Sequence, residues 1–382
     1  MRILHITPFY APAWAYGGIP RAVSSLARAQ YALPGIEVEV ATTDVLDARH
    51  RFHGAAANVH YFKNVCNSWA YNSMLLLPMG FRNFLEEQLQ SFDIVHLHGC
   101  RHLLNEIFVR RPERPPYVLS PHGTLPRIET KILLKGLWDR LFGRGVVDGA
   151  SRVLALTSAE ATRFEGIDSH RIRILPNIVE DPASKKDIPL QQASFASTFG
   201  INSPYLLYLG KLTPRKHVDT LLQAFSSLNL PDVILVIAGN DMGSGRRLRA
   251  LSRELSIEKR VSFTGLLIGR HRREALAGAE LLVYPGEHEV FGLVPFEGLF
   301  AGVVPIVSDD SGCGELIQEG ACGYRFHRGD ALDLTRVIAG ALHDRHGRSQ
   351  MIQRAQVFLR RFAPESVAET SLEIYREALR HQ

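Results

Sequence analysis

The stretch Y-L-L-Y-L-G-K-L-T-P-R-K-H-V-D-T-L-L-Q-A-F, Tyr205 to Phe225, contains a strand, a loop and a helix in that order. Its opening, 205–210, is a continuous apolar run that ends at a glycine, which is typical of a strand buried on both faces. A polar loop with a proline follows, and then a helix-like run. A strand followed by a helix is the repeating unit of parallel α/β sheets.

The same unit recurs along the whole chain. Further strands are expected in the C-terminal half at 233–239, 261–265, 281–285 and 304–308, and in the N-terminal half at 2–7, 38–44, 93–98, 117–122 and 152–157. The sequence therefore predicts an α/β protein with two doubly wound, Rossmann-like domains that face each other across a cleft. The expected boundaries are 1–180 for the N-terminal, acceptor-side domain, 181–203 for the linker, 204–363 for the C-terminal, nucleotide-sugar-binding domain, and 364–382 for a final helix that packs back on the N-terminal domain.

Composition excludes several other classes of protein. The chain has 382 residues with 46% hydrophobic and 22% charged residues, as in two globular domains of ordinary size. The first residues are expected to form a strand and not a signal peptide, and no apolar run is long enough to span a membrane. Four widely separated cysteines favour a reducing cytoplasm over a disulfide framework or a zinc site. A net charge of +5 is too small for a dedicated nucleic-acid binder.

Two glutamates flank a glycine in E-V-F-G-L-V-P-F-E, Glu289 to Glu297. A helix is expected to begin near Leu293, with Pro295 in its first turn. Gly292 lets a ligand approach the backbone, and the unpaired N–H groups of a helix start attract phosphate. A carboxylate on either side can accept hydrogen bonds from a vicinal diol. The pattern fits a sugar nucleotide, although for two glutamates alone solvated surface charges are the simpler explanation.

Six segments, in order, resemble those of retaining glycosyltransferases of family 4, which have the two-domain GT-B fold. They are Y-G-G-I-P-R-A-V (16–23), D-I-V-H-L-H-G (93–99), V-L-S-P-H-G (118–123), R-I-L-P-N-I-V (173–179), Y-L-G-K-L-T-P-R-K (208–216) and the E-x7-E signature at 289–297. Each segment is weak evidence by itself, but their common order along nearly the whole chain is specific.

The resemblance implies roles for C-terminal residues. Glu297 would hold the donor ribose, and Glu289 would lie near the donor sugar. Lys211 and Lys216 would neutralise the diphosphate as its charge grows. The backbone of Phe291, Gly292 and Leu293 would face the sugar and diphosphate, and Leu267 would mark the base-binding backbone. The sequence departs from the family at Lys211, which replaces an arginine, and at Val290, His217 and Gly298.

The resemblance also implies roles in the N-terminal domain. His122 would face the donor sugar, and the backbone of Gly17 and Gly18 would approach the diphosphate or the acceptor. His96 and His98 are expected to be structural residues at a strand end. No G-x-G-x-x-G occurs there, so a dinucleotide site has no support.

The implied function is transfer of a hexose, with retention, from a GDP- or UDP-linked sugar to a glycan or lipid-linked acceptor in cell-envelope or exopolysaccharide synthesis. His122, Lys216 and Glu289 are the expected catalytic residues. No cofactor and no metal are expected, because Asp309-Asp310 lacks the spacing of a metal-binding D-x-D motif. Two alternatives stay open: a GT-B sugar-nucleotide epimerase and a catalytically silent glycan-binding subunit.

The segment K-I-L-L-K-G-L-W-D-R-L-F-G-R, 131–144, has apolar residues at helical spacing with basic residues on its flanks. Such a helix either packs its apolar stripe on the N-terminal sheet or lies on an anionic membrane, and it can do both. The expected location is therefore the cytoplasm, with peripheral contact at the inner face of the cell membrane.

Overall fold

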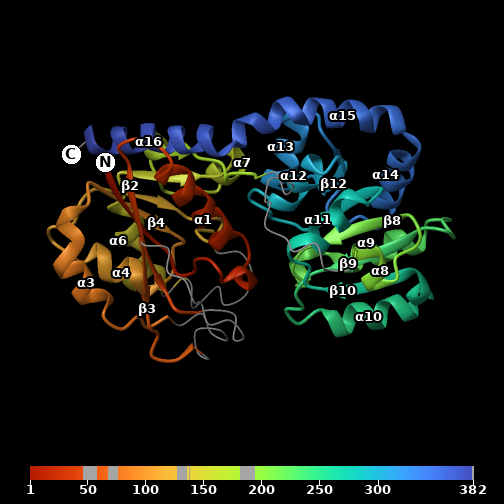
Figure 1. Cartoon of the computed structure of the whole chain (residues 1–382), viewed down its shortest axis with the longest axis horizontal. Helices are drawn as coiled ribbons and strands as arrows, with labels where there is room; N and C mark the ends of the chain where they lie inside the picture. Colours follow the sequence, from red (N-terminus) through yellow and green to blue (C-terminus); the bar gives the residue numbers. More distant parts are fainter. Residues whose placement is uncertain (46–57, 68–75, 127–135, 137, 181–193, 381–382) are drawn as a thin grey trace. The chain divides into compact units, whose positions relative to one another are not determined.

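The computed structural model describes residues 1–45, 58–67, 76–126, 136, 138–180 and 194–380. The chain divides into two compact units (Figure 1). One consists of Met1–Ile178 together with Phe362–Gln382, and the other of Val179–Arg361. The C-terminal segment thus belongs to the N-terminal unit.

The sheet of the N-terminal unit has the strand order β3-β2-β1-β4-β5-β6-β7 in the described residues, with every neighbouring pair parallel. Its strands are β1 (Arg2–Ile6), β2 (Glu37–Thr43), β3 (Val59–Phe62), β4 (Ile94–His98), β5 (Tyr117–Ser120), β6 (Arg152–Ala155) and β7 (Ile172–Ile174). The chain order reverses between β1 and β4, which makes the carboxyl ends of these two strands the expected ligand-binding edge.

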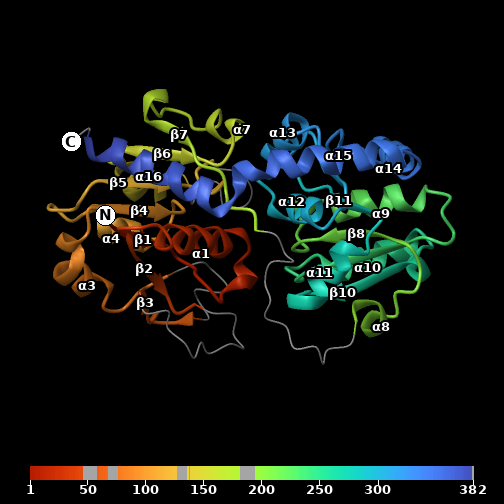
Figure 2. The same cartoon turned by 45° about the horizontal axis from the view of Figure 1, so that its top comes forward.

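Helices cover both faces of this sheet. One apolar cluster joins α1 (Gly18–Tyr31) and α16 (Pro364–Arg380) to the sheet, and the two helices lie side by side (Figure 2). A second cluster on the other face includes residues of α3 (Phe81–Gln88), α4 (Leu103–Val109) and α6 (Arg144–Asp148). Pro20 lies in the first turn of α1.

The C-terminal unit repeats the arrangement with the strand order β10-β9-β8-β11-β12-β13, again parallel throughout the described residues. The strands are β8 (Tyr205–Leu209), β9 (Ile234–Ala238), β10 (Val261–Gly265), β11 (Leu281–Tyr284), β12 (Pro305–Ser308) and β13 (Tyr324–Phe326). The helices are α8 (Phe195–Phe199), α9 (Val218–Ser226), α10 (Gly245–Glu254), α11 (Gly269–Ala277), α12 (Leu293–Phe300), α13 (Gly312–Glu319), α14 (Ala331–His343) and α15 (Arg345–Phe358). Its switch point lies between β8 and β11.

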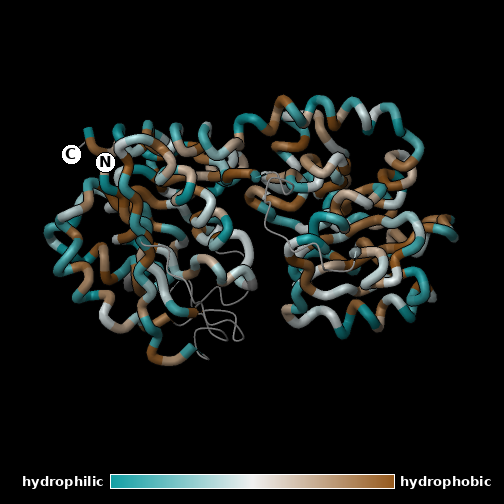
Figure 3. The backbone as a smooth tube through the Cα atoms, viewed as in Figure 1, coloured by the Kyte–Doolittle hydropathy of each residue, from teal (hydrophilic) through white to brown (hydrophobic). Residues whose placement is uncertain are grey.

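The predicted fold class of two doubly wound domains is confirmed. Figure 3 shows hydrophobic stretches within both units. The expected cleft between the domains stays a prediction. Residues 181–193 of the expected linker lie outside the described residues, and its remainder contains α8. Phe195 of α8 belongs to the apolar core of the C-terminal unit, so that part of the chain is domain and not linker.

Only the end of the 131–144 segment is described in regular structure. Asp139–Gly143 forms a π-helical turn that leads into α6, and Asp139 pairs with Arg101 at 2.8 Å. Arg140 and Arg144 are exposed. Across the described residues, no helix combines the length and the apolar character that crossing a membrane requires.

Candidate functional site

Two loops meet at the switch point of the C-terminal unit. The loop after β8 carries Lys216, and the loop after β11 carries Glu289. The Lys216 ammonium donates to Glu289 Oε1 at 2.5 Å and to the Tyr284 hydroxyl at 2.7 Å. That hydroxyl donates in turn to Glu289 Oε2 at 3.1 Å. The structure therefore brings together two of the three predicted catalytic residues, 73 positions apart in the chain, and adds a tyrosine that the sequence did not indicate.

The pair is nearly enclosed, with 10% of the Lys216 side chain and 11% of the Glu289 side chain exposed. Burial by itself would raise the pKa of Glu289, but the Lys216 charge, Arg215 at 4.0 Å and the two hydrogen bonds hold that pKa below its ordinary value. Burial and the neighbouring Glu289 charge raise the pKa of the Tyr284 hydroxyl. Near neutral pH the site thus holds the Glu289 carboxylate and the neutral Tyr284 phenol beside Lys216.

The helix start after Glu289 has the expected shape. Helix α12 begins at Leu293, as predicted, and Gly292 precedes it in the left-handed region with φ of 70°. A Cβ on Gly292 would lie 3.0 Å from Cys313 Sγ, so both the backbone angle and the space require glycine. The Cys313 N–H, in the first turn of α13, donates to the Glu289 carbonyl at 3.3 Å and ties the loop to that helix.

Glu297 lies inside α12 and pairs with Arg272 of α11. Both Nε, at 3.1 Å, and Nη2 of the guanidinium donate to Glu297 Oε2. Among the described residues, no group makes a hydrogen bond to the other oxygen, Oε1. One oxygen of Glu297 is thus fixed by a cation, and the other can accept a hydrogen bond from a ligand. Arg272 is 25 residues away, and no motif in the sequence pointed to it.

The other predicted donor-binding residues differ in what they offer. Lys211 follows the carboxyl end of β8 and is half-buried, and its carbonyl accepts from the Tyr208 hydroxyl at 2.8 Å. Leu267 and Phe291 are buried in the apolar interior, so only their backbone can contact a ligand. Leu293 is the first residue of α12 and is half-buried.

Two departures from the family pattern have a structural reason. His217 adopts the left-handed region with φ of 47°, where glycine is common, and its Nε2 lies 3.1 Å from Glu287 Oε1. At Gly298, a Cβ would lie 2.9 Å from Leu282 Cδ2, so glycine avoids a clash with β11.

The two neighbouring aspartates, 309 and 310, are engaged by protein groups. Asp309 accepts from His327 at 2.8 Å, and Asp310 accepts from the Ser308 hydroxyl at 2.7 Å and from Arg328 at 3.3 Å. Oxygen and nitrogen atoms of Glu287, His288 and Asp310 also lie within 4.8 Å of one another. Arg328 contacts both carboxylates of that group, which offsets the negative charge that would attract a cation.

In the N-terminal unit, His122 follows β5 in a turn with φ of 51°. The turn is held by Glu160 of α7 (Ser158–Ala161), whose Oε1 accepts from the Gly123 N–H at 2.7 Å. Glu160 is buried and was not indicated by the sequence. The His122 side chain is half-buried, its Nε2 lies 3.0 Å from His98 Nδ1, and burial lowers its pKa to about 4.

The glycine loop is positioned at the same edge of the sheet as His122. Gly17 has φ of 98° and caps α1, and Gly18 is the first residue of that helix. A Cβ on Gly18 would meet no atom within 4 Å, so its backbone is open to a ligand. His122 and the two glycines belong to one unit, while Lys216 and Glu289 belong to the other.

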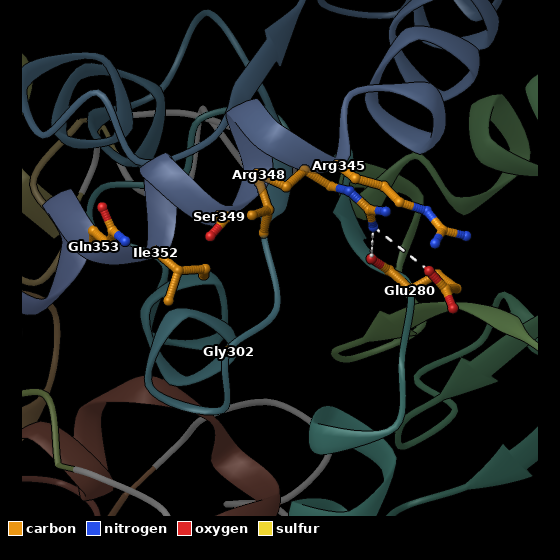
Figure 4. Close-up of a pocket in the computed structure, with 8 residues that line it drawn as sticks. Glu280, Gly302, Arg345, Arg348, Ser349, Ile352 and Gln353 are labelled. Carbon is orange, nitrogen blue, oxygen red and sulfur yellow. Dashed lines mark hydrogen bonds and ion pairs between the residues drawn. The ribbon is translucent and has the colours of Figure 1, made fainter.

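A cavity of about 340 Å³ lies elsewhere on the C-terminal unit (Figure 4). It is lined by Glu280, Val304, Arg348 and Ser349 among others. Glu280 and Val304 directly precede β11 and β12, so this cavity opens at the amino ends of the strands, opposite the Lys216–Glu289 pair. Arg348 donates to the Glu280 carbonyl at 2.8 Å, so its charge is already engaged there.

Solved structures with the same architecture define the class. The chain superposes on HepE from Anabaena in complex with UDP and glucose with a TM-score of 0.73, covering 98% of each chain at 18% identity. It superposes on sucrose-phosphate synthase from Thermosynechococcus elongatus with a TM-score of 0.76, covering 100% of each chain at 18% identity. Two parallel sheets with flanking helices, arranged as in these proteins, define a GT-B fold.

Comparison of the sequence with protein families identifies the family of this chain. Residues 191–358 match the family described as "Glycosyl transferases group 1", and residues 17–178 match the "Glycosyl transferase 4-like domain". The chain belongs to this family of GT-B glycosyltransferases, and sugar transfer is its class of activity. The resemblance inferred from the motifs is confirmed.

The relatives with named activities have low sequence identity to this chain. A GDP-mannose:cellobiosyl-diphosphopolyprenol alpha-mannosyltransferase of Xanthomonas oryzae pv. oryzae is 24% identical over 99% of this chain and 97% of that protein. A D-inositol 3-phosphate glycosyltransferase of Nocardia farcinica is 25% identical over 98% of this chain and 88% of that protein. The acceptors in these two names differ, so the names do not fix the substrates of this chain.

Proposed function

We propose that this protein transfers a hexose from a nucleotide-diphospho-sugar, with retention of anomeric configuration, to a glycan or lipid-linked acceptor. The observation that carries the proposal is the buried Lys216 ammonium at the β8–β11 switch point, held by Glu289 and Tyr284. A fixed cation beside a helix start suits a diphosphate whose charge grows as its bond to the sugar breaks.

The donor would extend along α12. Its diphosphate faces Lys216, Lys211 and the backbone of residues 291–293, and its ribose hydroxyls donate to Glu297. The support for the ribose role is that Arg272 fixes one oxygen of Glu297 and leaves Oε1 able to accept. Backbone near Leu267, at the carboxyl end of β10, is in reach of a base bound beyond the sheet edge. His122 and the Gly17–Gly18 loop would contact the sugar and the acceptor.

The preferred reaction is displacement on one face of the sugar. The bond between C1 and the diphosphate oxygen breaks, the acceptor oxygen bonds C1 from the same face, and its proton passes to the leaving phosphate. Glu289 is a poor nucleophile for the alternative double displacement, because Lys216 and Tyr284 engage both of its oxygens. Its role would be to hold Lys216 in place and to contact the donor sugar. No metal is required in this proposal, and chelation with EDTA should leave the rate unchanged.

The proposed acceptor lies at a membrane surface. We propose that the protein acts in the cytoplasm, at the inner face of the cell membrane, in cell-envelope or exopolysaccharide synthesis. The support is the basic flank of the 131–144 segment, of which Arg140 and Arg144 are exposed, and four free cysteines. The relative from Xanthomonas oryzae, whose name specifies a diphosphopolyprenol acceptor, makes a polyprenyl-linked acceptor the first to test.

A donor panel tests the proposal. Wild-type protein is incubated with GDP-mannose, UDP-glucose and UDP-galactose, with and without a polyprenyl-diphosphate glycan, and released nucleoside diphosphate is measured. One donor should give acceptor-dependent release that Lys216→Met suppresses and the exposed-lysine control Lys259→Met does not. Failure of every donor to bind would contradict the proposed site, and binding without turnover would favour a silent binding subunit.

A further inference from the structure

Buried polar side chains form a continuous hydrogen-bonded network inside the N-terminal unit. The network spans the switch point between β1 and β4 and the helices α1 and α16. Its members are His5, Gln30, His96, His98, Ser120, His122, Ser371 and Tyr375. All except His122 are at most 3% exposed, so protein groups alone satisfy their hydrogen bonds.

The direction of the network is set at Gln30. The Ser371 hydroxyl, on α16, donates its single proton to the Ala368 carbonyl at 2.6 Å. Ser371 Oγ can then only accept, and the Gln30 side-chain nitrogen donates to it at 2.7 Å. The Gln30 carbonyl oxygen therefore faces His5 Nε2, at 2.7 Å, as an acceptor. His5 must carry its proton on Nε2.

The assignment passes from ring to ring. Because His5 is protonated on Nε2, its Nδ1 accepts from His98 Nε2 at 2.8 Å. His98 Nδ1 is then unprotonated and accepts from His122 Nε2 at 3.0 Å. Burial lowers the pKa of His5 and of His122 to about 4 and that of His98 well below its ordinary value, so near neutral pH each ring carries one proton. Nδ1 of His122 is left unprotonated, and no other described residue makes a hydrogen bond to it.

A second branch agrees with the first. The Gln30 side-chain nitrogen also donates to the Tyr375 hydroxyl at 3.0 Å, and the proton of that hydroxyl has His96 Nδ1 as an available acceptor at 2.6 Å. His96 then donates from Nε2 to the Ser120 hydroxyl at 2.7 Å. The nitrogens of His5, His96 and His98 lie within 4.8 Å of one another, close enough for a metal ion. Every one of these nitrogens already has a protein partner, which favours a proton network over a metal site.

We propose that Gln30 is a positioning residue for the transfer: oriented by α16, it fixes the tautomer of His122 through His5 and His98. His122 then presents an unprotonated Nδ1 and accepts a hydrogen bond from a sugar hydroxyl. The inference rests on the proposed function for the role of His122, whereas the fixed tautomer does not depend on any activity. The C-terminal helix α16 would then orient Gln30 as well as pack on the sheet. Its Ser371 makes this contact although it lies 341 positions from Gln30 in the sequence.

The test measures the tautomers directly. Protein labelled with ¹⁵N-histidine is studied by long-range ¹H–¹⁵N correlation near neutral pH, with the His122 signals assigned from a His122→Gln variant. In wild type, His5, His98 and His122 should each show a protonated Nε2 and an unprotonated Nδ1. Gln30→Met removes the acceptor for His5. In this variant the hydrogen bonds from His5 to His122 should reverse their direction and place a proton on His122 Nδ1. That variant should lose about tenfold in kcat/KM, as expected for one neutral hydrogen bond.

Two further variants sharpen the result. Gln30→Glu keeps an acceptor for His5, so it should retain the wild-type tautomer of His122 and restore most of the activity. Gln350→Met makes the same change as Gln30→Met on the exposed surface of α15 and should alter neither readout.

A wild-type His122 protonated on Nδ1, or one bound zinc per chain, would overturn the inference even if Gln30→Met did not fold. An unchanged tautomer or an unchanged kcat/KM in folded Gln30→Met would also overturn it. Fixed tautomers in a protein that transfers no sugar would instead count against the proposed function.

Discussion

Removing the Lys216 ammonium should destabilise the C-terminal unit and slow transfer. Lys216→Met keeps the length of the side chain but leaves the Glu289 carboxylate, 11% exposed, without its main cation. Breaking one side of a buried ion pair costs about 3–5 kcal/mol. Arg215, at 4.0 Å from Glu289, offsets part of this, so a loss of about 3 kcal/mol in the free energy of unfolding is expected. The double variant Lys216→Met/Glu289→Gln removes the uncompensated charge and should recover about 1–2 kcal/mol of that loss.

The two units can be followed separately. All three tryptophans, residues 14, 69 and 138, precede the C-terminal unit, so their fluorescence in urea reports only the N-terminal unit. Cys313 is buried beside Gly292, and its labelling rate in urea reports opening of the C-terminal unit. Lys216→Met should accelerate Cys313 labelling and leave the fluorescence transition unchanged, while Lys259→Met should change neither.

Activity separates the stabilising role from the catalytic one. If Lys216 stabilises the growing charge of the diphosphate, kcat should fall more than KM rises, and the double variant should recover stability without recovering kcat. Additive effects of the two substitutions on stability would mean that Lys216 and Glu289 do not stabilise each other. A change confined to KM would mean that the ammonium only binds the donor.

Three further outcomes are expected. Glu297→Ala should weaken the binding of GDP or UDP in calorimetry by about 1.5–3 kcal/mol, because a charge-assisted acceptor is lost; unchanged affinity, equal to that of the exposed control Glu254→Ala, would refute the ribose role. Lowering the pH from about 7 to about 5.5 should destabilise the N-terminal unit. The pKa values of His5 and His102 are lowered to about 4 in the folded protein, so both stay neutral there while the same residues become protonated in the unfolded chain. Each contributes about 1.4 kcal/mol per pH unit below 6.5 until the folded pKa is reached, and an unchanged tryptophan transition in urea at the lower pH would contradict this. The protein should co-sediment with anionic vesicles at low salt but not at high salt, since each basic residue adds about 1 kcal/mol; equal sedimentation of a variant with serine at all four basic positions would reject the segment as the contact. Those positions are Lys131, Lys135, Arg140 and Arg144.

The sequence indicated the central strands because continuous apolar runs have few alternatives to burial in a covered parallel sheet. The strands β3, β7 and β13 were not predicted. They are three or four residues long, lie at or near sheet edges, and are only partly buried, so little hydrophobic pattern marks them. The start of α12 was predicted because Gly292 and Pro295 are local signals for a helix start.

The partners of the site residues could not be predicted in the same way. Lys216 and Glu289 were assigned by family resemblance, but their contact depends on two loops that converge only in the folded sheet. Arg272 and Gln30 lie on helices and carry no motif, and an arginine or glutamine on a helix is usually solvated. Their roles depend on which distant side chains they meet, and that information appears only in three dimensions.

The stereochemistry of transfer can be followed in an NMR time course of wild-type protein with the donor chosen by the panel and a glycan acceptor. Nucleoside diphosphate should appear together with a new glycoside that has the anomeric configuration of the donor, without exchange of the proton at C2. Lys216→Met should slow both signals equally. A product of inverted configuration would contradict the retaining reaction, and C2 exchange without a glycoside would identify an epimerase instead.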